Sequence, residues 1–315
     1  MTFEIIDMIK FESDHISGNI SASGIYVWIV IESDDNVGIL YKIIDNKLYE
    51  HLYIKKDINF PIIYSGYTTP DFKYLCLIDS NISQLRIRIF DSKSLSIVST
   101  LYIHIHIQPK FVNIPKFSIN NKHIFITYDN VSKIFDIISG DQLLEITDTI
   151  SSIKFFVIDD YIYLIISSPG ILKLFKYINH YKFIHELQIS GICNNIDIYY
   201  NNQNIELLLA ISNHTQTEFS SDNGNIVSLH IINDTLIIIK TIYSYFEIFN
   251  ILWNQFKHNF IYCQKFNNYL ILNYPNHFCL PLHLSTCDLH LCSTCQYLLI
   301  LGSSPGSSKL FLIKI

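Results

Sequence analysis

The sequence predicts an all-β fold built from repeats, and three observations support that prediction. A short phrase recurs along the chain: a basic residue, an aliphatic residue, an aromatic residue and often Asp, preceded by a polar turn. The copies stand roughly 40–55 residues apart, which is the period of a four-stranded propeller blade. Hydrophobic residues make up 49% and charged residues only 16% of the chain, and the apolar set is rich in the strand-forming residues Ile, Tyr, Phe and Val.

The repeated phrase marks the third strand of each expected blade. The last gap, from the marker at His230 to the marker at Phe311, is about 81 residues long and fits two units of about 40. The copies are Gly38–Lys42, Arg88–Asp91, Lys133–Asp136, Lys173–Lys176 and Lys309–Phe311, with a weaker one at Val227–His230.

Polar turns and apolar runs divide the chain into blades, each with four strands in the order a, b, c and d. The final segment offers only three strands, and the N-terminal segment Thr2–Ile9 supplies the fourth. We therefore predict a single domain over residues 1–315, a seven-bladed β-propeller closed by pairing of the N-terminal strand with the last blade. Closure leaves no blade edge open to aggregation. The six expected complete blades cover residues 16–56, 60–107, 111–148, 152–189, 191–243 and 245–284, and the final strands are Leu289–Cys292, Tyr297–Leu301 and Ser308–Ile315.

Several copies of the phrase resemble the WD40 repeat family. Ser303–Phe311 is similar to the turn into the third strand of that repeat, and Arg88–Asp91 and Lys133–Asp136 are similar to its Trp-Asp ending, with Phe in place of Trp. Trp28 and Trp253 are the only tryptophans and neither precedes Asp, so the buried Asp-His-Ser/Thr-Trp network of the family is not carried over. The resemblance covers most of the chain in rhythm and implies a platform for protein partners within a larger complex.

The charge balance argues against phosphate-bearing partners. The net charge is −6 and the pI is about 6.1, whereas nucleic-acid binding needs clustered cations. Arg86 and Arg88 are the only arginines, and Ile87 between them faces the other side of a strand. The adjacent arginine pair of phosphoinositide-binding propellers is therefore missing, which disfavours lipid headgroups as well as nucleic acid.

Other features of the composition indicate an intracellular protein. The seven cysteines are an odd number and unevenly spread, unlike the framework of a disulfide-rich secreted domain. Acidic residues lie near the N-terminus, where a signal peptide carries positive charge. No apolar run reaches the length of about 18 residues that a membrane span needs. The expected location is the cytoplasm or the nucleus, with no membrane span.

The densest set of metal-ligating residues lies near the C-terminal end. Cys292 and Cys295 have the two-residue gap of a zinc knuckle. No second such pair follows, and alternation along strands would point neighbouring ligands to different sides. We therefore predict no bound metal, with zinc as the alternative. The set comprises His277, Cys279, His283, Cys287, His290, Cys292 and Cys295.

No motif for catalysis stands out. There is no G-x-S-x-G elbow and no Gly-rich phosphate loop, so we predict no catalytic residue and no cofactor. His104 and His106 fall on one face of an expected outer strand, where half-exposed histidines are a simpler interpretation than a metal or pH-sensing pair.

Two functions follow as hypotheses. The first is a non-catalytic protein-interaction scaffold or adaptor subunit of a larger intracellular complex. The alternative is a propeller hydrolase or metal-dependent enzyme with its site in the axial funnel. The polar insertion Asn213–Asn223 in the fifth blade is expected to be a surface loop, which either contacts a partner or has no binding role.

Overall fold

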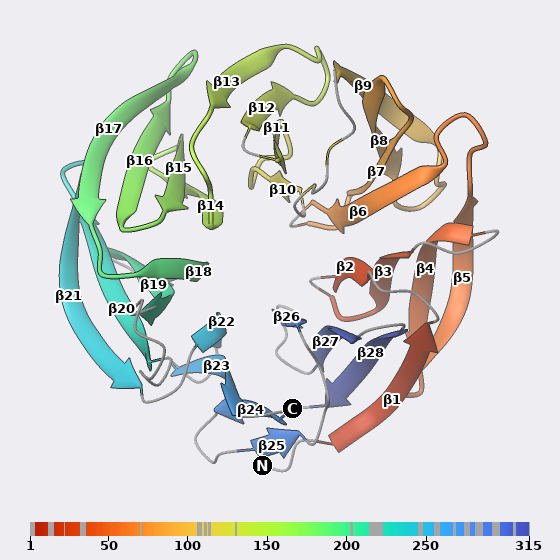
Figure 1. Cartoon of the computed structure of the whole chain (residues 1–315). Helices are drawn as coiled ribbons and strands as arrows, with labels where there is room; N and C mark the ends of the chain where they lie inside the picture. The colour runs from red at the N-terminus through yellow and green to blue at the C-terminus, as the bar shows by residue number, and fades with distance from the viewer. Residues whose placement is uncertain are drawn as a thin grey trace. The chain divides into compact units, whose positions relative to one another are not determined.

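In the residues that it describes, the computed structural model has 28 strands (Figure 1). It describes residues 4–11, 16–21, 23–31, 36–69, 71–105, 109, 112, 115–129, 131–201, 204–213, 223–244, 248–254, 259–266, 269–273, 278–280, 286–291, 297–304 and 307–314. Within these residues the strands form seven four-stranded antiparallel sheets, which we call blades. None of the described segments is a helix with the length and apolarity that crossing a membrane requires.

The chain divides into two compact units, and the first consists of residues Met1–Thr147 and Ser285–Ile315. It holds four blades. Blade 1 is β2 (Ile16–Ile20), β3 (Tyr26–Ile31), β4 (Asn36–Ile44) and β5 (Lys47–Lys55); blade 2 is β6 (Ile62–Thr68), β7 (Tyr74–Ser80), β8 (Gln84–Asp91) and β9 (Ile97–His104). Blade 3 is β10 (Lys116–Phe117), β11 (His123–Tyr128), β12 (Val131–Asp136) and β13 (Gln142–Ile146); blade 7 is β26 (Thr286–Leu291), β27 (Tyr297–Ser304), β28 (Ser307–Lys314) and β1 (Glu4–Phe11).

The second unit, Asp148–Leu284, holds the other three blades. Blade 4 is β14 (Ser152–Ile158), β15 (Tyr161–Ser168), β16 (Ile171–Tyr177) and β17 (Tyr181–Gln188). Blade 5 is β18 (Ile192–Asn201), β19 (Asn204–Asn213), β20 (Asn223–Ile232) and β21 (Thr235–Ser244). Blade 6 is β22 (Ile248–Asn254), β23 (Asn259–Phe266), β24 (Tyr269–Asn273) and β25 (Phe278–Leu280).

The predicted blades are confirmed, and so is the role of the N-terminal strand. β1 pairs antiparallel with β28, from Glu4 opposite Lys314 to Phe11 opposite Ser308. Thr2 and Phe3 of the predicted strand, and residues 281–284 at the end of the predicted sixth blade, lie outside the described residues.

The repeated phrase corresponds to the third strand and its entry into the outer strand. In blades 1 to 4 the pairing between these two strands has a β-bulge next to the marker aromatic, at Tyr41, Phe90, Phe135 and Phe175. A bulge bends the strand and increases its twist. In blade 5 the same irregularity lies between Ser228 and Leu229. The predicted marker His230 is therefore wrong by one residue, because Leu229 holds the equivalent position.

The Asp that often ends the phrase shapes the turn that follows it. In blade 2, Asp91 Oδ1 accepts hydrogen bonds from the N–H groups of Lys93 and Ser94, each at 3.0 Å. In blade 3, Asp136 Oδ1 accepts from Ile138 and Ser139, each at 2.9 Å. These local bonds replace backbone partners in the turn, which explains why the repeat places Asp there.

The hydrophobic core lies between the faces of neighbouring blades. In the first unit, separate clusters fill the spaces between blades 7 and 1, blades 1 and 2, and blades 2 and 3. Trp28 is fully buried between blades 1 and 2, where its indole N–H donates to the carbonyl of Cys76 at 3.2 Å. A Cβ at Gly66 would stand 2.5 Å from that carbonyl oxygen, so this close approach requires glycine.

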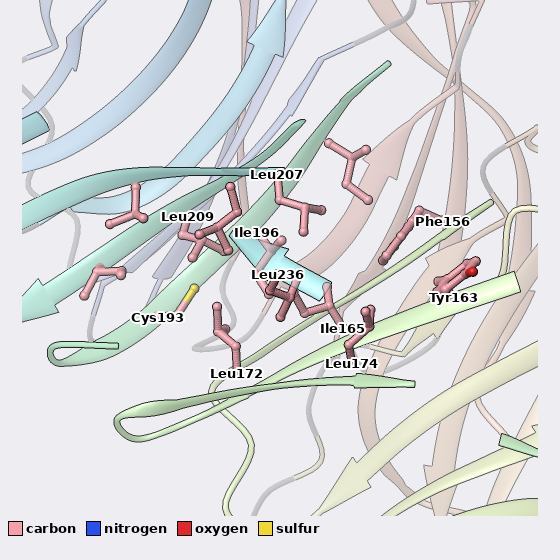
Figure 2. Packing of buried hydrophobic residues seen from close by; sticks show 14 residues of the cluster. Phe156, Tyr163, Ile165, Leu172, Leu174, Cys193, Ile196, Leu207, Leu209 and Leu236 are labelled. Carbon is pink, nitrogen blue, oxygen red and sulfur yellow. The ribbon is translucent and has the colours of Figure 1, made fainter. Parts of the chain in front are cut away.

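The second unit repeats the same arrangement. Its largest cluster lies between blades 4 and 5. Figure 2 shows Phe156, Ile165 and Leu174 of blade 4 packed with Ile196, Leu207 and Leu209 of blade 5. A smaller cluster lies between blades 5 and 6. Alternation along each strand directs one set of side chains to each neighbour, and the blades therefore depend on one another for burial.

Candidate functional site

One end of blade 2 combines buried charge with exposed apolar side chains. The segment Asp57–Phe60 precedes β6, and the turn Asn81–Gln84 joins β7 to β8. Ile62 at the start of β6 pairs with Ser80 at the end of β7. In antiparallel strands, the segment that leads into β6 and the turn that leaves β7 therefore lie at the same end of the sheet. We call Asp57–Phe60 together with Asn81–Gln84 the blade 2 corner.

A buried ion cluster holds the corner together. Asp79 is fully buried and accepts from Arg86, with Nε–Oδ1 and Nη2–Oδ2 distances of 2.8 Å each. Arg88 Nη2 donates to the same Oδ2 at 2.5 Å. Arg86 also reaches out of its strand to Asp57, with an Nη1–Oδ2 distance of 2.7 Å. Asp79 thus binds both arginines, and Arg86 also holds the segment that leads into β6.

The cluster is close to electrically neutral, since two guanidinium groups meet two carboxylates. Burial raises the pKa of Asp57, but hydrogen bonds from Arg86 and from the N–H of Asn59, with the charges of Arg86 and Arg88, lower that pKa more. The net pKa of Asp57 is below its usual range. Both arginines have carboxylate partners within the cluster, which leaves little attraction for an external anion.

Aromatic rings cover the outer side of the cluster. The guanidinium carbon of Arg86 lies 3.7 Å from the centroid of the Phe60 ring. Tyr102 on β9 is directly opposite Arg86 on β8, and its ring centroid is 6.3 Å from that of Phe60. Phe60 therefore packs on both residues. Cation–π contact of this kind adds to the hydrogen bonds that fix Arg86.

The two tips of the corner are ordered by their own hydrogen bonds. Asp57 Oδ1 accepts from the N–H of Asn59 at 2.9 Å, and the carbonyl of Asp57 accepts from the N–H of Phe60 at 3.1 Å. Asn81 Oδ1 accepts from the N–H groups of Ser83 and Gln84 at 3.0 and 2.9 Å. Each tip is thus a tight turn that displays the residue at its apex.

Those apical residues are isoleucines. Ile58 is 93% exposed and Ile82 is 82% exposed. Hydrogen bonds hold the backbone of both turns, and the two isoleucine side chains extend into solvent. The one acid of the corner, Asp57, is paired with Arg86, and the two apices are apolar, which suits contact with another apolar surface.

Sequence reasoning noted Arg86 and Arg88 but missed their partners. The structure confirms that Ile87 faces the other way, since it is fully buried among the residues between blades 2 and 3. The signal that could have found the cluster is Asp79. From the sequence we expected it in the turn into the arginine strand, whereas it lies on β7, just before that turn. Antiparallel pairing then places Asp79 opposite Arg86. Asp57 contacts Arg86 across distant parts of the chain, and no sequence pattern predicts that contact.

The side chains of the candidate zinc ligands lie outside the part of the chain that the structure describes. Cys279 lies on β25, and Cys287 and His290 lie on β26. His277, His283, Cys292 and Cys295 lie outside the described residues. Among the described ranges no group of three or more His, Cys, Asp or Glu residues could hold a metal ion.

The other predicted features fall as follows. His104 is exposed on β9, the outer strand of blade 2, and His106 lies outside the described residues. The insertion connects β19 to β20, with Asn213 paired to Asn223, and its residues 214–222 are likewise outside them.

Several described residues bear on the enzymatic alternative. Cys76 and Cys193 are free but buried, and burial raises the pKa of each thiol, that of Cys193 to about 12. Neither is an accessible thiolate. On the first strands of blades 4 and 5, Lys154 Nζ binds Asp197 Oδ1 at 2.8 Å. This contact is an ion pair between two strands and does not indicate a catalytic site.

The comparisons with known proteins identify the fold. No family model matches the sequence, and no curated protein sequence matches it. The β-propeller domain of Cps50 (Swd1) from Myceliophteria thermophila is similar in structure, with a TM-score of 0.67 and 10% sequence identity over 100% of both chains. At this identity the likeness shows the fold alone. The protein has a β-propeller fold.

Proposed function

We propose that the protein is a non-catalytic platform that binds other proteins within a larger assembly, and that the blade 2 corner is one of its contact surfaces. The observation that carries this proposal is the 93% exposure of Ile58 on a turn pinned by Asp57 to the buried Arg86. A turn whose backbone is already held by hydrogen bonds loses less conformational entropy when a partner binds. Interface centres are also depleted in charge, as the two isoleucine tips are.

Membership of the WD40 family and a single domain over residues 1–315 belong to the same proposal. The phrase that resembles the WD40 repeat lies on the third strand of the blades, and the structural likeness covers the whole chain. A location in the cytoplasm or nucleus accords with the composition. Both arginines already have carboxylate partners, which supports the inference that nucleic acid and phosphoinositides are not ligands.

The non-catalytic part of the proposal is supported by the chemistry of the described residues. The two described free cysteines are buried thiols. The strongest charge cluster is neutralised internally and faced by Phe60. These groups act on the stability of the blades and leave no activated nucleophile or general base in the blade 2 corner.

A matched pair of variants tests this surface. We expect Ile58→Ser combined with Ile82→Ser to reduce co-purification of protein partners by about tenfold, because truncating a central apolar contact costs more than about 1 kcal/mol each. Ile138→Ser is the control, since Ile138 is 85% exposed on the turn after β12, at the opposite end of its blade. The measurement is quantitative mass spectrometry of proteins retained by the tagged chain. Equal recovery of partners with the parent, the double variant and Ile138→Ser would remove the blade 2 corner from the proposal.

A further inference from the structure

The outer strand of blade 5, β21, is an apolar sheet edge. It runs for ten residues, Thr235–Ser244, and pairs only with β20 in its four-stranded sheet. Its one charged residue is Lys240. Its exposed large apolar residues are Ile237, Ile238, Ile239, Ile242 and Tyr243.

On its outer side, most of the main chain of β21 has no backbone partner among the described residues. The N–H of Leu236 donates to Nδ1 of His185 on β17 at 3.4 Å. Beyond that point, no backbone–backbone hydrogen bond joins residues 237–243 to a described residue outside the sheet. An edge strand directs half of its N–H and C=O groups away from the sheet. These groups can form a further antiparallel or parallel ladder.

Other outer strands carry features that discourage such pairing. β5 contains Lys47, Glu50 and Lys55, and charged residues on an edge are a common protection against strand addition. β9 has no such charge, but its exposed Tyr102 packs against Phe60. β21 carries one charged residue, Lys240, where β5 carries three.

We propose that β21 is a binding site for an extended segment of another protein, which adds to blade 5 as a fifth strand. Main-chain hydrogen bonds supply affinity in this mode, and alternate side chains supply specificity. The segment is apolar, to cover the isoleucines, and carries one Asp or Glu to meet Lys240. Lys240 forms no ion pair with any residue in the described part of the chain.

Charge also favours a different protein over a second copy of this chain. β21 holds Lys240 and no acidic residue, so two β21 strands paired together would leave both lysines without a carboxylate. A strand with an Asp or Glu can pair with Lys240, whereas a second β21 strand cannot. The proposal shares with the preceding section the premise of protein binding, but it rests on a different blade and can hold if the blade 2 corner does not.

The test uses a defined probe, a fluorescent decapeptide of alternating Val and Thr with one central Glu. We expect this peptide to bind the full chain about three- to tenfold more tightly than the same peptide with a central Lys, because opposite charges stabilise cross-strand pairs and like charges destabilise them. Lys240→Glu should reverse the order. Methylation of alternate peptide amides should weaken binding by about tenfold or more, since it removes the ladder donors and keeps the side chains.

Two variants of the protein give the matched control. Ile239→Lys places a charge on the edge at a residue that is 51% exposed, and Tyr53→Lys does the same at a 53% exposed residue of β5. Only Ile239→Lys should weaken binding of the Glu peptide. The proposal is overturned if no peptide binds, if the methylated peptide binds as well as its parent, or if Tyr53→Lys has the same effect. A concentration-dependent dimer that Ile239→Lys dissociates would overturn it in favour of a second copy.

Discussion

Deletion of residues 1–11 is expected to make the protein insoluble or to abolish its cooperative unfolding. The deletion removes β1, the outer strand of blade 7, and leaves β28 without its partner from Ser308 to Lys314. It also removes Phe11, Ile6 and Ile9, which pack in the cluster between blades 7 and 1. Burial of each large apolar side chain contributes about 1.5–3 kcal/mol. The total approaches the whole stability of a typical domain, about 5–15 kcal/mol.

Solubility and urea unfolding followed by circular dichroism measure this effect. Deletion of residues 1–3 alone is the control, because it keeps all of β1 from Glu4 to Phe11. A chain without residues 1–11 that unfolds cooperatively at the urea midpoint of the parent would show that the N-terminal strand is dispensable.

Asp79→Asn is expected to destabilise the fold by about 3–5 kcal/mol, the cost of removing one partner from a buried ion pair. Asp79 is fully buried and accepts from both Arg86 and Arg88. Arg88 depends on it especially, since the buried Nε of Arg88 has no hydrogen-bond partner in the described part of the structure. The substitution would leave two buried positive charges beside a single carboxylate, that of Asp57.

Two further variants show whether the cost comes from buried charge. Glu145→Gln breaks an ion pair with Lys133 in which Glu145 is exposed, and it should leave the urea midpoint close to that of the parent, because solvent screens exposed ion pairs. The triple change Asp79→Leu, Arg86→Met and Arg88→Met should recover most of the loss, because apolar groups can replace a buried ion cluster. The urea midpoint is the measurement. Equal midpoints for Asp79→Asn and Glu145→Gln would contradict a central role for this cluster.

The blades could be predicted from the sequence because the features that define them are local. Alternating apolar residues, polar turns and the aromatic-Asp phrase all act within one hairpin, as the bonds from Asp91 and Asp136 to their own turns show. The N-terminal strand was predictable by counting strands. The marker in blade 5 was predicted one residue too late, because the bulge follows Ser228. The weak copy of the phrase in this blade does not define the position of the bulge.

The candidate surfaces could not be predicted, because they depend on contacts between distant segments. Arg86 contacts Asp57 only in the folded chain, where the segment after blade 1 places Asp57 at the end of blade 2. The exposure of Ile239 follows from the position of β21 at a sheet edge, whereas its letters alone predict a buried strand. Apolar composition indicates a core, and only the topology tells which apolar residues are left outside it.

Amide hydrogen exchange on the free protein and on the co-purified assembly tests the binding role most directly. The account predicts that residues 56–60 and 81–84 exchange more slowly in the assembly, since a partner seated on Ile58 and Ile82 would cover both turns of the blade 2 corner. Unchanged exchange in both turns, with slower exchange confined to the first strands of the blades around Lys154 and Asp197, would contradict it and favour a site for a small ligand.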